Sequence, residues 1–164
     1  MVWVERIQKQ KLINPCNLFI ILSYINLYKF KQTIMSLVLS TKEHQIKRIA
    51  DEDIICYKYV NYIHKKKRFV TPYQHRRIEI EKSYSADFRL VQHYNYVVVT
   101  EGIHSFKNLE SCIDDSKSLF FDNDGMKTHF VKCLIPKGAE YYCGNFLIYE
   151  AYASNKITYL EIIN

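Results

Sequence analysis

Glycine is absent from the first hundred residues of this chain, and the first glycine in the sequence is Gly102. Two-residue β-hairpin turns need backbone conformations that glycine adopts most easily, so hairpins before Gly102 are expected to close through longer loops. The chain is also rich in tyrosine, phenylalanine and isoleucine, which pack well on a pleated sheet. The sequence therefore predicts strands that are joined by loops.

The composition favours an α+β or mostly β domain, and with the helical stripe described below the predicted class is α+β, with a mainly antiparallel sheet and one principal covering helix. The helix is expected from Ser105 to Ser118, because Phe106, Leu109, Cys112 and Ile113 recur on one face and Ser105 stands at the N-cap position. Strands are expected over 51–62, at Ile78 and Ile80, over 88–100, over 128–135 and over 154–163. The run from Asp122 to Gly125 lacks most calcium-loop ligands, so a turn is expected there.

The chain divides into three parts by composition. Residues 1–34 contain an apolar run from Leu18 that is shorter than the roughly 20 residues of a membrane-spanning helix, so no membrane span is predicted. Three interpretations of this segment stay open. It is a signal peptide, although no small-residue cleavage site follows the run; or translation starts at Met35; or the segment is an amphipathic helix docked on the domain or a partner. Residues 35–50 are expected to form a linker or arm, and residues 51–164 a single domain.

The net charge of +6 is concentrated at one end of the chain. Residues 1–34 carry five basic and one acidic side chain, a balance of +4, and residues 35–164 carry 18 basic and 16 acidic ones, a balance of +2. The five cysteines are odd in number and include no CxxC pair, which indicates neither a disulfide framework nor a zinc cage. We therefore expect no metal, no cofactor and a cytoplasmic location, in the host if a phage encodes the chain.

The stretch EGIHSFKNLESC, residues 101–112, is a candidate site because the pKa of histidine suits acid–base chemistry and ligand binding. Turn and cap chemistry favours a structural interpretation, in which Gly102 turns the backbone, Ser105 caps the helix and His104 bonds to a carbonyl group. Under the functional interpretation, residues of several blocks line a ligand site: His104, Ser105, Tyr57, Lys58 and Tyr142. No catalytic residue is predicted.

A basic stretch at 64–77 is the second candidate site, for nucleic acid. Its cations are Lys65, Lys66, Lys67, Arg68, Arg76 and Arg77. Phe69 and Tyr73 lie between them and could stack on bases while the cations meet phosphates. A solvated loop between strands has the same composition, and Glu79 and Glu81 follow closely, so nucleic-acid binding is an alternative and not the favoured function.

Four blocks carry a resemblance to known proteins: DIICYKYV, EGIHSFKNLESC, FVKCLIPKGAEYYCG and YASNKITYLEII. Over residues 51–163 the chain resembles a group of uncharacterised domains in proteins of phages, large DNA viruses and gut bacteria. The matching positions include Tyr57, Lys58, Gly102, His104, Phe106, Pro136, Gly138 and Lys156. The resemblance implies a source and no activity.

The favoured function is a non-catalytic accessory or interaction module of a phage or bacterial mobile element, which binds a small ligand or a host protein. An enzymatic alternative rests on a faint resemblance to ADP-ribosyltransferases. It would use Lys58 on one strand, the His104-Ser105 corner and Glu150 before the last strand. The chain lacks the paired acidic motif of that family around Glu150.

Overall fold

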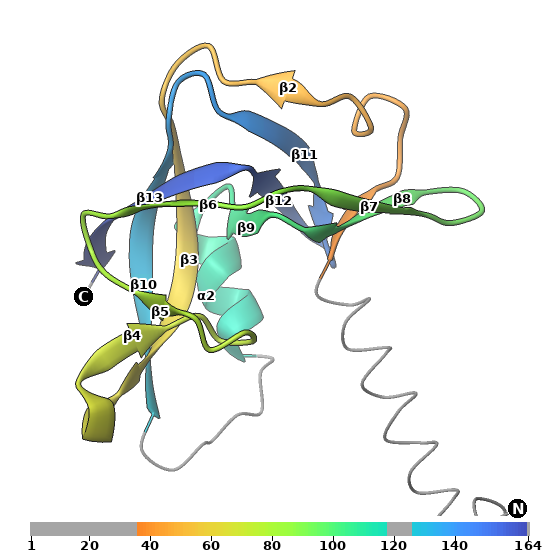
Figure 1. Cartoon of the computed structure of the whole chain (residues 1–164). Coiled ribbons are helices and arrows are strands. Elements are labelled where there is room, and N and C mark those ends of the chain that lie inside the picture. Colours follow the sequence, from red (N-terminus) through yellow and green to blue (C-terminus); the bar gives the residue numbers. More distant parts are fainter. Residues whose placement is uncertain (1–35, 118–125, 164) are drawn as a thin grey trace, which may run out of the picture. The chain divides into compact units, whose positions relative to one another are not determined.

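A computed structural model describes residues 36–117 and 126–163 (Figure 1). The predictions for residues 1–34 and for the turn at 122–125 lie outside these described residues. The strands are β1 (Leu37–Leu39), β2 (Arg48–Ile49), β3 (Ile54–Ile63), β4 (Arg68–Val70), β5 (Arg77–Ile78), β6 (Ser83–Ser85), β7 (Arg89–Gln92), β8 (Val97–Glu101), β9 (Ile103–Phe106), β10 (Met126–Ile135), β11 (Glu140–Phe146), β12 (Tyr149–Ser154) and β13 (Lys156–Ile163). The helices are the 3₁₀ turn η1 (His64–Lys66) and α2 (Leu109–Lys117).

The predicted α+β class is wrong, because the described part of the chain is nearly all β. Strands contain 56% of its residues and helices 10%. The strands form one antiparallel sheet that curls into a half-barrel, in the order β6-β13-β10-β3-β9-β12-β11-β1-β8-β7. α2 is a short element that packs against β3, β9 and β10 beside this sheet (Figure 1).

The two terminal strands of the sheet, β6 and β7, are neighbours in sequence. β6 pairs with β13 at one end of the strand order and β7 pairs with β8 at the other. Only residues 86–88 separate them, so one extended segment runs from one edge of the sheet to the other (Figure 1). The chain itself therefore bridges the open side of the half-barrel.

The helix begins later than predicted, because sheet pairing takes the residues that were expected in its first turn. Ser105 lies in β9, opposite Tyr152 of β12. The cap is Asn108, whose Oδ1 accepts a hydrogen bond from the backbone N of Ser111 at 2.8 Å. The local cap signal of Ser105 is thus outweighed by ladder hydrogen bonds along Ile103–Phe106.

The stretch 35–50, expected as a linker or arm that begins with a short strand or extended segment, contributes two short strands to the sheet. β1 lies between β8 and β11, with Leu37 opposite Val99 and Val38 opposite Asn145. Leu37 and Leu39 are fully buried in a cluster with Phe106. A second cluster contains Cys56, Val60, Val131, Cys133, Ile135 and Ile157.

Loops close the strands before Gly102, as predicted. β3 and β4 are joined through η1 and Lys67, whose φ of 47° is left-handed. The single strand expected over 88–100 is two strands, β7 and β8, with a loop over 93–96 between them. The strands expected over 51–62 and at the C-terminal end are confirmed as β3 and β13.

Candidate functional site

The GIHSF corner is part of β9, and hydrogen bonds to the backbone hold its histidine. Nε2 of His104 lies 3.0 Å from the carbonyl oxygen of Val99. Nζ of Lys58 donates a hydrogen bond to the carbonyl oxygen of His104. The structure thus brings Lys58 and His104 together. The bond of His104 to a carbonyl group is the one that the structural interpretation of this corner describes, whereas Ser105 does not cap the helix.

Both groups are perturbed in the direction of their neutral forms. Burial, and after it the charge of the nearby Lys58, lower the pKa of His104 to about 4. Burial also lowers the pKa of Lys58. A carbonyl oxygen only accepts hydrogen bonds, so Nε2 of the neutral imidazole carries the proton. His104 therefore keeps its proton on Nε2 near neutral pH and donates it in a hydrogen bond to the Val99 carbonyl oxygen. An acid–base catalyst, in contrast, must exchange its proton at that pH.

Ser105 and the nearby cysteines provide no activated nucleophile. Ser105 is 2% exposed, and its hydroxyl lies beside the thiol of Cys56. Burial raises the pKa of Cys56 to about 11 and that of Cys112 to about 12, and it raises the pKa of Cys133 as well. Such thiols hold almost no thiolate at neutral pH, and thiolate is the reactive form.

Thiol labelling should distinguish Cys143 from the other described cysteines. Cys143 is partly buried, whereas Cys56, Cys112 and Cys133 are fully buried. We expect iodoacetamide to label Cys143 of the folded protein at least about tenfold faster than the three buried cysteines, because those react only after local unfolding exposes them. Peptide mass spectrometry measures this, with labelling in urea as the control. Native labelling of Cys56 as fast as Cys143 would contradict the packing.

The five predicted ligand residues do not form one site. Tyr57 is partly buried against the cluster around Phe106. Tyr142 is 7% exposed and packs edge to face on Phe88, with ring centroids 5.1 Å apart. Tyr142 lines a surface groove that none of the other four reaches. Glu150, from the enzymatic alternative, is exposed and ion-paired with Lys107 at 2.8 Å.

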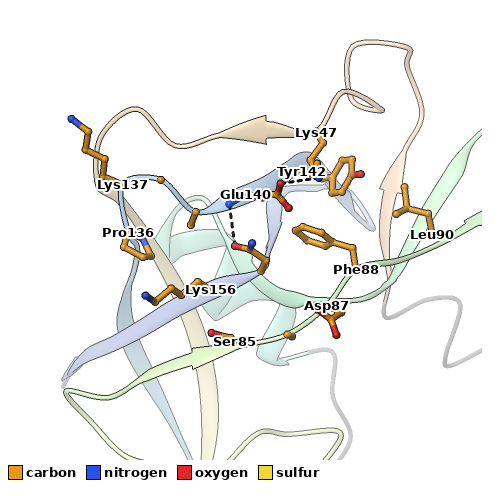
Figure 2. Close-up of a pocket in the computed structure, with 14 residues that line it drawn as sticks. Lys47, Ser85, Asp87, Phe88, Leu90, Pro136, Lys137, Glu140, Tyr142 and Lys156 are labelled. Carbon is orange, nitrogen blue, oxygen red and sulfur yellow. Dashed lines mark hydrogen bonds and ion pairs between the residues drawn. The ribbon is translucent and has the colours of Figure 1, made fainter.

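The groove has a volume of about 820 Å³ and lies where β13 continues from β12 at Asn155 (Figure 2). Residues of the stretch 85–90 form one wall and residues 136–140 form the other. One end, which we call the aromatic end, holds Phe88, Leu90 and Tyr142. The other, which we call the cationic end, holds Pro136, Lys137 and Lys156.

Hydrogen bonds hold the turn wall of the groove in place. The backbone N of Gly138 donates to the carbonyl oxygen of Ala50 at 2.7 Å, and that of Lys137 donates to Oδ1 of Asp53 at 2.8 Å. Gly138 has a φ of 83°, which favours glycine. This explains the IPKGA block in local terms and gives the groove a preformed edge.

Phe88 in the opposite wall rests on a glycine. A Cβ atom on Gly102 would lie 3.1 Å from the Phe88 ring, and Gly102 has a φ of 124°. The first glycine of the chain therefore lets the aromatic end form. Phe88 and Leu90 were missed in the sequence, because ADFRL carries no turn or charge signal that separates it from an ordinary strand.

The charge of the groove is positive by one, from three lysines and two acids. Lys47 pairs with Glu140 at 2.8 Å. Lys137 and Lys156 form no ion pair with the described residues, and Asp87 forms none either. Lys137 and Lys156 both lie at the cationic end, with the Lys137 side chain pointing outward from the turn, whereas Asp87 lies on the opposite wall (Figure 2).

In the predicted basic stretch, most of the cations are exposed to solvent, but one of the two aromatic side chains points into the protein. Lys65, Lys66, Lys67, Arg76 and Arg77 are exposed, and Arg68 is partly buried. Tyr73 turns inward: its hydroxyl lies 2.7 Å from that of Tyr59, which donates to Asp115 at 3.0 Å. The expectation that Tyr73 stacks on bases is therefore wrong.

Comparisons with known proteins give no family for this chain. No family model matches it, and no curated protein or solved structure is significantly similar to it. In residues 36–117 and 126–163, no helix has the length and apolar character needed to cross a membrane. The same residues contain no group of three or more potential metal ligands in a suitable arrangement.

Proposed function

We propose that this protein is a non-catalytic interaction module that binds an extended, acidic segment of a partner protein in the groove. The observation that carries the proposal is the preformed groove, with apolar side chains at one end and, at the other, two lysines that form no ion pair with the described residues. Charge of one sign selects partners of the opposite sign. The source suggested by the resemblance makes a phage or host protein the natural partner.

The walls favour a peptide over a compact ligand. Residues 86–88 run along the groove between β6 and β7, and in the described residues Asp87 and Phe88 form no backbone hydrogen bond outside the strand ladders. An extended peptide can pair with such free backbone groups, and its side chains then enter the pockets beside it. Leu90, 42% exposed, offers such a pocket an apolar wall.

Panning a random-peptide phage library on the immobilised protein tests the proposal. We expect enrichment of peptides that combine acidic and apolar residues. A synthetic copy of a selected peptide should bind at least about tenfold more weakly to a Lys137→Glu/Lys156→Glu variant, because like charges then face each other. Fluorescence anisotropy measures the Kd.

Two further variants make the result specific to the groove. Leu90→Ser should also weaken binding, and its side chain is exposed enough to leave folding unchanged. Lys65→Glu/Lys66→Glu reverses the same number of charges outside the groove and should leave binding unchanged. A library without acidic preference, or equal affinity for all these variants, would refute the proposal.

A further inference from the structure

A second charged surface lies away from the groove, at the end of the β3–β4 hairpin. Its cations are Lys65 and Lys66 of η1, Lys67 after it, and Lys127 near the start of β10. All four are exposed, and none forms an ion pair with the described residues. This cationic tip contrasts with the other end of β3, which follows Asp51, Glu52 and Asp53.

Aromatic rings line the base of the cationic tip. Lys127 and Phe69 stand opposite Tyr62 on the two neighbouring strands. The Tyr62 ring lies 5.0 Å from Phe69, 5.1 Å from His64 and 6.2 Å from His129, measured between centroids. His64 is exposed, and Tyr62, Phe69 and His129 are partly buried. A row of rings thus lies within reach of four lysines.

Turn formation does not explain these residues. Lys67 has a φ of 47°, where glycine or asparagine would be less strained. His129 has a lowered pKa, first from burial and then from the nearby positive charge of Lys127. Positive charge therefore converges on this surface, and the imidazole of His129 stays neutral and free to stack.

We infer that the cationic tip binds single-stranded nucleic acid, with phosphates on Lys65, Lys66, Lys67 and Lys127 and bases on Tyr62 and its neighbouring rings. Flat rings next to cations suit bases that are already unstacked, and every base offers a face for stacking. Bases in a duplex are stacked on each other and offer no such face. The cations alone would bind any polyanion.

Fluorescence anisotropy with labelled oligothymidylate and the full chain tests this inference. Affinity should fall steeply with salt, with a log–log slope of about −3, because each of four phosphate contacts contributes roughly −0.7 for single strands. The Lys65→Ala/Lys66→Ala/Lys67→Ala variant should bind at least about tenfold more weakly and lose about 2 of that slope.

Ring variants separate nucleic acid from other polyanions. Tyr62→Ala should weaken oligothymidylate binding roughly tenfold with an unchanged salt slope, while Tyr62→Phe, which keeps the ring, should bind like the wild type. His64→Ala also removes a ring, but at an exposed position outside the strands, so it tests the role of the rings without disturbing the sheet. Urea unfolding of each variant checks the fold.

Three results would overturn the inference. The first is no saturable binding of oligothymidylate at low salt. The second is equal binding of heparin and oligothymidylate with no loss in Tyr62→Ala and His64→Ala, which would mean a polyanion surface only. The third is equal affinity for the matching duplex. The groove variant Lys137→Glu/Lys156→Glu should leave oligothymidylate binding unchanged. The inference about the cationic tip can therefore be refuted without refuting the proposed function of the groove, and the reverse also holds.

Discussion

Replacing Gly144 by valine is expected to unfold the domain. A Cβ atom at Gly144 of β11 would lie 2.5 Å from the carbonyl oxygen of Val38 and 2.9 Å from Cδ2 of Leu39. The first of these is a backbone atom of the paired strand β1, which cannot rotate away as a side chain can. β1 must therefore separate from β11, and Leu37 and Leu39 then lose their buried positions.

The expected loss is large compared with the stability of a typical domain. Forced overpacking alone costs about 1–3 kcal/mol, and losing the burial of each leucine adds about 1.5–3 kcal/mol, against a typical total of about 5–15 kcal/mol. Circular dichroism and urea unfolding measure the effect. Gly144→Ala should already lower the urea midpoint.

Gly138→Ala is the matched control. Its Cβ would meet nothing within 4 Å, so only the φ of 83° opposes the substitution. A residue held in such a conformation costs of order 1–3 kcal/mol, without any steric clash. If Gly144→Ala is as stable as Gly138→Ala, the close contact between β1 and β11 is wrong.

The second large effect is acid destabilisation through His104. Its pKa is about 4 in the folded state against an ordinary value of 6.5. Between these values the unfolded chain binds a proton that the folded protein does not, so stability falls as the pH falls from 6.5 to 4. The difference amounts to about 3 kcal/mol at the acid end.

A His104→Gln variant isolates this contribution. Glutamine still has an N–H to donate to the Val99 carbonyl but does not titrate. Urea unfolding at a series of pH values should show the wild type more stable at pH 7, with its advantage shrinking by about 3 kcal/mol toward pH 4. Parallel stability curves for the two proteins would contradict a neutral His104 with a lowered pKa in the folded state.

Asp115 acts in the opposite direction and needs its own control. Burial raises the pKa of Asp115 above 3.8. Asp115 therefore contributes most to the free energy of unfolding when the pH is below its pKa in the unfolded chain. This contribution is lost as the pH rises through its pKa in the folded protein. An Asp115→Asn background removes this contribution. The difference in pH dependence between the wild-type histidine and the His104→Gln variant should persist in that background.

Local pattern predicted the parts of the fold that depend on local sequence. The run DIICYKYVNY became β3, and Pro136 marks the end of β10, because strand propensity and proline act over a few residues. Ser105 misled the helix prediction, since its pairing with Tyr152 depends on a strand far along the chain. The strand within 35–50 likewise pairs with strands far along the chain, which a linker or arm expected from local sequence does not specify.

The candidate sites show the same limit. The exposure of the lysines at 65–67 was predictable from the sequence, because runs of like charge lie in solvent in most folds. Which rings stand beside them was not visible: Tyr73 is nearby in sequence but turns toward Asp115, while His129 comes from β10. The groove joins residues of four separate stretches, so no window of sequence contains it.

The position of β1 affects the order of events during synthesis. β1 is the earliest strand among the described residues, yet both of its neighbours, β8 and β11, are made much later. Pairing between distant segments slows folding, because the intervening chain must first be closed into a loop. On the ribosome, Leu37 and Leu39 therefore have no paired strand until β8 has left the exit tunnel, and the other edge of β1 stays unpaired until Asn145 of β11 has left it as well. The nascent chain is a substrate for chaperones over that interval.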